Sequence, residues 1–224
     1  MTHRISSDEL NELIGTPKCP LILDVRREAV FADAKTRIAG AYWHDVASIE
    51  AIAHLIDVDF GTIVYCAHGH NVSALAATRL REIGFPVRVL DGGIAAFADA
   101  GGLLVNKADG LPMGTSRQPA IWVTRERPKI DRIACPWLIR RFVDPFAEFH
   151  FVEAQWVKDV AAEMGGVPFD IDGVHWSHRG ETCTFDTMIS EYGLGSPALD
   201  AVAQIVRGAD TARLDLAPQA AGLL

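Results

Sequence analysis

The short segment Cys66–Asn71 brings one cysteine, two histidines and a glycine together between an apolar run and a helical pattern. The run Thr62–Tyr65 predicts a buried strand, and the apolar spacing that follows predicts a helix from Asn71. A thiol between a strand and a helix N-terminus lies among unpaired backbone N–H groups, which favour the thiolate. We therefore interpret Cys66 as a nucleophile and not as a structural core cysteine. The backbone cradle for an anion would comprise Ala67, His68, Gly69, His70 and Asn71.

The surrounding elements must place this loop at one edge of a sheet. Strand patterns alternate with helix patterns through the first half, which predicts an α/β fold with a largely parallel sheet covered on both faces. Leu21–Val25 is another apolar run, and Asp24 and Arg26 stand at its end. Ligands of such sheets bind at the carboxyl ends of the strands. Cys66, Asp24 and Arg26 are all expected at that edge.

Four segments of the first half resemble a rhodanese domain: LILDVR, RIAGA, IVYCAHGHNVSALAATRL and VRVLDGGIAAFADAG. The resemblance covers about residues 1–105 and implies a rhodanese-like parallel-sheet domain. It also implies that a thiolate, here that of Cys66, takes a sulfane sulfur as a persulfide and passes it to a nucleophile, with no cofactor. Asp24 and Arg26 match a strand end of that family which supports the site.

One residue of the loop departs from the family pattern. The loop commonly runs Cys-x-x-Gly-x-Arg, and Asn71 occupies the arginine position here. Arginine binds an oxyanion through two parallel N–H···O hydrogen bonds, and asparagine cannot do this. We therefore expect weakened thiosulfate recognition, partly restored by His68 and His70 with a pH dependence set by their titration. The same departure argues against a phosphatase-like loop.

The glycine- and proline-containing stretch 106–119 predicts a linker to a second domain at 120–224, of smaller α+β architecture. Within that domain, Pro136 fits the first position of a helical turn, with Cys135 as its N-cap or as the end of a short preceding turn. Four segments resemble the C-terminal domain of bacterial chromate-resistance proteins: KIDRIACPWLIRRFVDPFAEFHFV, PFDIDGV, HRGETCTFDTMISEYGL and ALDAVAQIVRGAD. This resemblance implies a role in lowering chromate accumulation or toxicity, and it names no reaction.

Polar residues of the second half form a candidate second site. His178 and Glu181 are three residues apart, and Cys183 and Asp186 repeat that spacing, so these four could ligate a transition metal. Alternatively, the histidine only donates hydrogen bonds and the acids favour a helix N-terminus. The remaining candidates of this domain are Asp131, Cys135, Arg140 and Arg179.

The net charge, cysteine content and apolar runs of the chain limit its possible partners and location. The 224 residues carry a net charge of −8, which argues against nucleic acid as a partner. Four widely spaced cysteines without a CxxC pair predict reduced thiols and a cytoplasmic location. No apolar run is long enough to span a membrane, and the N-terminus lacks the apolar core of a signal peptide.

Two main hypotheses follow. The first is a cytoplasmic sulfurtransferase that carries a persulfide on Cys66 and acts in chromate stress. Its donor would be thiosulfate or another sulfane-sulfur compound, and its acceptor a small thiol such as glutathione, or Cys135 or Cys183. The alternative is a non-catalytic sensor or binding protein whose loop holds chromate or sulfate. A third idea is redox detoxification of chromium. The oligomeric state stays open.

Overall fold

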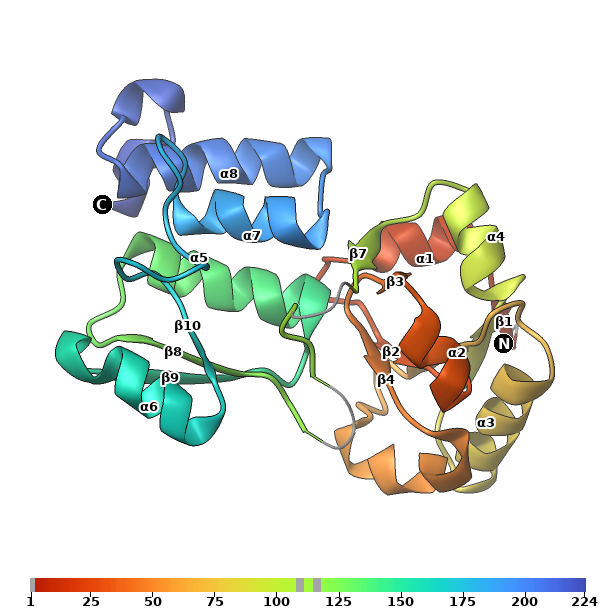
Figure 1. Cartoon of the computed structure of the whole chain (residues 1–224). Coiled ribbons are helices and arrows are strands. Elements are labelled where there is room, and N and C mark those ends of the chain that lie inside the picture. The colour runs from red at the N-terminus through yellow and green to blue at the C-terminus, as the bar shows by residue number, and fades with distance from the viewer. Residues whose placement is uncertain (1–2, 108–110, 115–117) are drawn as a thin grey trace. The chain divides into compact units, whose positions relative to one another are not determined.

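The protein is described by a computed structural model over residues 3–107, 111–114 and 118–224, which form two compact units (Figure 1). The first unit holds the elements from β1 (Arg4–Ile5) to β7 (Leu104–Asn106) and also Arg141–Pro145; the second holds Pro119–Arg140 and Phe146–Leu224. Within the predicted linker, residues 108–110 and 115–117 lie outside the described part of the chain.

The first unit is built on a parallel sheet of five strands in the order β1-β6-β5-β2-β4. All of its strand pairings are parallel. The remaining strands of this sheet are β2 (Leu21–Asp24), β4 (Ala41–Trp43), β5 (Thr62–Tyr65) and β6 (Val87–Leu90). Every residue of central β5 is buried, because the sheet is covered on both faces. The prediction of an α/β fold with a parallel sheet is confirmed.

Helices cover this sheet on both sides. The helices are α1 (Ser7–Leu13), α2 (Glu28–Asp33), α3 (Asn71–Glu82), α4 (Gly93–Asp99) and a 3₁₀ helix (Val46–Leu55). Ile63 of β5 shares a core cluster with Leu10 of α1 and Phe97 of α4. Because strand side chains alternate, Val64 points to the opposite face, where α3 packs. A separate antiparallel pair joins β3 (Thr36–Ile38) to β7.

Helix α1 begins at a capping box formed by Ser6 and Glu9. The hydroxyl of Ser6 accepts a hydrogen bond from the backbone N–H of Glu9 at 3.2 Å. The Glu9 carboxylate in turn accepts one from the Ser6 backbone N–H at 2.9 Å. Two N–H groups that lack a partner within the helix are thereby satisfied.

The second unit combines a three-stranded parallel sheet, in the order β10-β8-β9, with four α-helices. Its elements are β8 (Ile121–Arg125), α5 (Ile130–Leu138), β9 (Glu148–Val152), α6 (Val157–Met164), β10 (Val167–Pro168), α7 (Thr184–Tyr192) and α8 (Pro197–Asp210). Helices α5, α7 and α8 pack on one another, and α6 packs against the sheet (Figure 1). The predicted α+β architecture is confirmed. No helix of the described residues is both long and apolar enough to span a bilayer.

The expected position of Pro136 was wrong. Helix α5 starts at Ile130, with Lys129 as its N-cap, so Pro136 lies inside the helix and Cys135 is not a cap. Proline has no N–H to donate to the preceding turn, which weakens the regular α-helical pattern there. The chain continues from Ile139 to Val143 as a wider π-helical turn, a common way to re-pair backbone groups after such an interruption.

Candidate functional site

Cys66 follows β5 directly and precedes α3, at the carboxyl end of the central strand. This is the edge at which parallel sheets bind their ligands. The residue is 7% exposed, so most of its surface is shielded from solvent. The Cys66–Asn71 loop that follows leads straight into the N-terminus of α3, as its sequence pattern predicts.

Hydrogen-bond donors surround the sulfur of Cys66. The Ser73 hydroxyl lies 3.3 Å from Sγ and also 3.0 Å from the carbonyl oxygen of His70. Burial raises the pKa of the Cys66 thiol, but hydrogen bonds from the Ser73 side chain and from the backbone of Ser73, His70 and His68 outweigh burial and lower that pKa. The loop therefore stabilises the thiolate, which is the reactive form of cysteine.

The turn between β6 and α4 supports the loop from behind. The backbone N–H of Ile94 donates to the Cys66 carbonyl oxygen at 3.0 Å, and that of Ala95 donates to the Ala67 carbonyl oxygen at 3.1 Å. Gly93 lies so close that a Cβ atom on it would meet the Cys66 oxygen at 2.3 Å. Its φ of +63° is also one that side-chain-bearing residues rarely adopt. Only glycine fits behind this loop.

A pocket of about 230 Å³ opens at Cys66. Its volume suits a small molecule and not a folded protein segment. His68, His70 and Asn71 are exposed, and all three line the pocket. The other lining residues are Arg26, Arg27, Val30, Ala67 and Val72. Two arginines thus approach the pocket from outside the loop, although Asn71 occupies the position that the family usually gives to arginine.

Asp24 and Arg26 form a buried ion pair at the end of β2. The Arg26 Nε atom lies 2.9 Å from each oxygen of Asp24, and the Tyr65 hydroxyl donates to Oδ2 of Asp24 at 2.9 Å. The indole N–H of Trp43 donates to the Arg26 carbonyl oxygen, also at 2.9 Å. Burial raises the pKa of Tyr65 well above its usual range, so the hydroxyl stays a donor. These contacts lock the strand ends beside the pocket.

In the second unit, the two candidate arginines make surface contacts apart from each other. Arg140 donates to the Ala147 carbonyl oxygen at 3.1 Å and lies over the ring of Phe149, 5.1 Å from its centroid. Arg179 pairs with Glu191 at 2.5 Å. Both arginines are exposed and engaged in ordinary packing or ion pairing. The geometry gives neither one a ligand-binding arrangement.

Cys135 and Cys183 are fully buried. Burial first, and the Asp131 carboxylate second, raise the pKa of both thiols well above the usual range. A thiol without water and beside negative charge stays protonated. Both residues are therefore poorly suited to accept sulfur or to bind a metal as thiolates.

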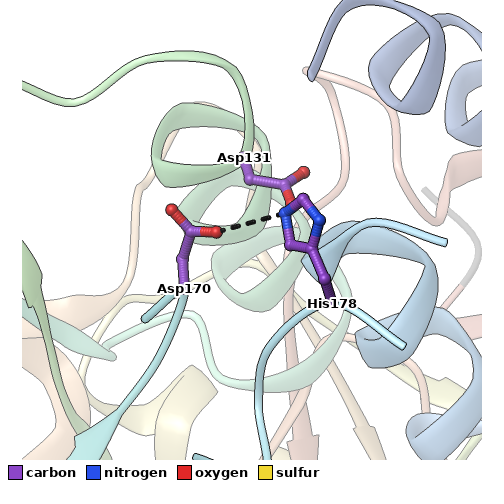
Figure 2. A group of neighbouring side chains, drawn as sticks. All are labelled: Asp131, Asp170 and His178. Atoms are coloured by element: carbon purple, nitrogen blue, oxygen red, sulfur yellow. Dashed lines mark ion pairs between the residues drawn. The ribbon is translucent and has the colours of Figure 1, made fainter. Parts of the chain in front are cut away.

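The structure separates the four residues of the predicted metal set. Glu181 is exposed, and Asp186 accepts a hydrogen bond from the Cys183 backbone N–H at 3.0 Å, as an acid at the start of α7. The spacing of three thus serves a helix cap and not a metal. Among the described residues, a different set brings its ligand atoms within 4.8 Å of one another: Asp131, Asp170 and His178 (Figure 2).

This second cluster draws on elements far apart in the sequence. Asp131 lies in α5, Asp170 follows β10, and His178 stands in the loop before α7 (Figure 2). Asp210, at the end of α8, approaches His178 Nε2 to 3.0 Å. The contact with the Asp131 carboxylate outweighs burial and raises the pKa of the His178 imidazole. Burial and the neighbouring carboxylates raise the pKa of Asp210.

Sequence reasoning missed Asp170 and Asp210 as members of this cluster. Asp170 belongs to the PFDIDGV segment, where it closes a short strand in a left-handed conformation with φ of +53°. An acid at the carboxyl end of a parallel strand was the available signal. Asp210 gave no such signal, because it ends a surface helix.

Comparison with known proteins gives separate matches for the N-terminal and the C-terminal part of the chain. Residues 6–100 match the model of the rhodanese-like domain. Similar solved structures include a rhodanese-related protein from Thermoplasma volcanium, 26% identical over 47% of this chain and 99% of that chain, with a TM-score of 0.40. Another is the Alr3790 protein from Anabaena sp., 27% identical over 46% of this chain and 82% of that chain, with a TM-score of 0.41.

Residues 122–224 match the model of the ChrB C-terminal domain. A curated relative is Protein ChrB of Cupriavidus metallidurans, 38% identical over 81 residues, which are 36% of this chain. The match spans 24% of that relative's length. The chain therefore joins a rhodanese-like domain at residues 6–100 to a ChrB C-terminal domain at residues 122–224.

Proposed function

We propose that this chain is a sulfurtransferase in which Cys66 carries a sulfane sulfur as a persulfide. The observation that carries the proposal is the environment of the Cys66 sulfur: hydrogen bonds from Ser73 and from the loop backbone lower its pKa, and a small pocket gives access to it. A thiolate at the mouth of a small pocket can attack a small sulfur donor.

In the first half-reaction, the Cys66 thiolate attacks the outer sulfur of thiosulfate or of another sulfane-sulfur donor. A new S–S bond forms, the donor's own S–S bond breaks, and the rest of the donor leaves with the bonding electron pair, as sulfite when the donor is thiosulfate. The persulfide bears the negative charge, which the N–H groups of the loop and the N-terminus of α3 stabilise. Because asparagine replaces the usual arginine at position 71, thiosulfate is held mainly by the loop backbone and the neighbouring histidines.

In the second half-reaction, an acceptor thiolate attacks the outer sulfur of the persulfide and Cys66 leaves as a thiolate. The pocket volume of about 230 Å³ favours a small thiol such as glutathione as the acceptor. Cys135 and Cys183 were the other acceptors considered from the sequence. Their burial and raised pKa argue against that role.

The ChrB C-terminal domain supplies the proposed setting. We infer that sulfur transfer by the first domain serves a response to chromate, since the second domain matches the model of that name over residues 122–224. All four cysteines are free, which suits a reducing compartment, and the proposal places the protein in the cytoplasm.

Intact-mass spectrometry of the full chain after incubation with thiosulfate tests the proposal. The wild type should gain the mass of one sulfur, and glutathione should remove it. Cys66→Ala should gain none. Cys19→Ser is the matched control, because Cys19 is the other thiol of the first unit and lies outside the loop; it should gain sulfur as the wild type does.

Two results would overturn the proposal. One is an equal gain of sulfur by Cys66→Ala and the wild type. The other is a wild type that binds sulfate or chromate in calorimetry yet gains no sulfur from thiosulfate or from a polysulfide donor. That second result would instead favour a non-catalytic oxyanion sensor.

A further inference from the structure

The second unit holds a buried carboxylate that lacks enough partners. Asp131 is 1% exposed. Its Oδ2 atom accepts a hydrogen bond from the Thr184 backbone N–H at 2.6 Å, whereas its Oδ1 atom is buried and has no hydrogen-bond partner within the described part of the chain. An ionised carboxylate in such surroundings is costly unless a cation or donors satisfy it. The site therefore calls for a positively charged ligand.

Two of the three carboxylate distances around His178 are longer than hydrogen bonds and lie close to the ligand–ligand spacing of a metal centre. Its Nε2 atom lies 3.5 Å from Asp131 Oδ2 and 3.6 Å from Asp170 Oδ1 (Figure 2). It also lies 3.0 Å from Asp210 Oδ2. One ring nitrogen cannot donate to three carboxylates, and the first two distances exceed ordinary N–H···O bonds. Metal–ligand bonds of about 2.1 Å place neighbouring ligands about 3.0 to 3.4 Å apart, in octahedral or tetrahedral sites.

The ligand atoms are held by a second layer of contacts. Arg125 and Arg132 each lie 3.2 Å from Asp170 Oδ2, which leaves Oδ1 as the oxygen nearer to His178. The Thr184 hydroxyl donates to Asp170 Oδ1 at 2.9 Å. Such outer contacts orient carboxylates toward a bound metal and tune its affinity. The left-handed backbone of Asp170 is a further local strain of the kind that gathers at functional sites.

The cluster is also accessible. A cavity of about 640 Å³ is lined by Arg125, Lys158, Asp170, Ser177 and His178, among others. The His178 side chain is 41% exposed, while Asp131 is closed off behind it. An ion could therefore enter from the cavity, and water from the cavity could complete its coordination.

We propose that Asp131, Asp170 and His178, with Asp210 at the rim, bind one divalent first-row transition metal ion. The donor set contains one imidazole nitrogen and carboxylate oxygens, which suits Mn²⁺ or Zn²⁺ and disfavours Cu⁺. The thiols of Cys135 and Cys183 do not belong to the group of ligand atoms that lie within 4.8 Å of one another among the described residues. The proposed metal site shares only His178 with the set of ligands predicted from the sequence, and its other three ligands are different residues.

Metal titration of the full chain after treatment with a chelator tests this site. The electron paramagnetic resonance signal of aqueous Mn²⁺ should fall as one ion binds per chain, and Zn²⁺ should restore it by competition. His178→Gln should weaken Mn²⁺ binding roughly 10- to 100-fold. His175→Gln is the matched control: it changes a histidine of the same loop that faces Glu191, and it should bind Mn²⁺ as the wild type does.

Circular dichroism checks the fold of each variant, and Asp210→Asn replaces His178→Gln if that variant does not fold. Asp210→Asn should also weaken Mn²⁺ binding, by a smaller factor. The proposal is overturned if the wild type binds neither Mn²⁺ nor Zn²⁺ at millimolar concentration. It is equally overturned if the site variant and His175→Gln bind Mn²⁺ with the same affinity.

Discussion

The two units surround their buried cysteines with opposite kinds of groups. In the first, Cys66 is met by the Ser73 hydroxyl and by backbone N–H groups, which lower its pKa. In the second, Cys135 and Cys183 are fully buried near Asp131, which raises their pKa. All three thiols are at least largely buried, so burial alone does not decide whether a cysteine reacts. The sign of the neighbouring groups decides it.

Buried acids differ between the units in the same way. Asp24 accepts hydrogen bonds from the guanidinium of Arg26 and from the Tyr65 hydroxyl, so its charge is neutralised by directly contacting side chains. Around His178, both nearby arginines pair with Asp170, and one oxygen of Asp131 lacks a partner among the described residues. The first arrangement can position a nucleophile without a ligand, whereas the second is suited to receive a cation.

Removing Asp24 should give the largest effect, because it breaks the charge balance of the first unit. Asp24→Ala leaves the Arg26 guanidinium buried without its counter-ion and should lower the free energy of unfolding by about 3 to 5 kcal/mol. Urea denaturation followed by circular dichroism measures this. Asp91→Ala, at the exposed Arg4–Asp91 pair, is the control and should cost about 1 kcal/mol or less. Equal losses would mean that the buried pair is not special.

Thiol labelling should also distinguish the two units, through a large difference in the alkylation rates of their cysteines. With iodoacetamide at neutral pH, Cys66 should react about a hundredfold faster than Cys135 or Cys183 in the folded chain, because only its thiolate is stabilised. Peptide mapping by mass spectrometry gives the rate at each site. Fast labelling of either second-unit thiol at native conditions would contradict the comparison.

Ser73→Ala should have the smallest of these effects, a change in the reactivity of Cys66. Loss of the hydroxyl removes a donor to the Cys66 thiolate, so the pKa of Cys66 should rise. The labelling rate of Cys66 grows as pH rises through that pKa, so the variant's pH–rate profile should shift to higher pH and its rate near neutral pH should fall. Ser190→Ala, an exposed serine of α7, is the control. An unchanged profile for Ser73→Ala would show that the backbone donors suffice.

Local patterns in the sequence predicted the first unit well. The Cys66 loop and the start of α3 each depend on residues within a few positions of one another, and both occur where they were expected. Their physical causes are local: backbone N–H groups at helix starts and apolar residues at helical spacing. The pairing of Asp24 with Arg26 is similarly local, because the two side chains flank one strand end.

Local patterns failed where a site is assembled from distant segments. Asp131, Asp170 and Asp210 come from α5, the end of β10 and the end of α8, and only the packing of the second unit brings them to His178. Spacing within one short segment instead favoured Glu181, which is exposed. A residue spacing can indicate neighbours on a single helix, but it does not show which loops will meet.

The glycine behind the Cys66 loop bears on protein engineering. Since Gly93 leaves no room for a side chain against the Cys66 carbonyl, the loop and the turn after β6 form one structural module, although they are more than twenty positions apart in the chain. A designer who wished to install this reactive cysteine in another parallel sheet would have to transplant both pieces together. The six residues of the loop alone would arrive without the support that fixes their shape.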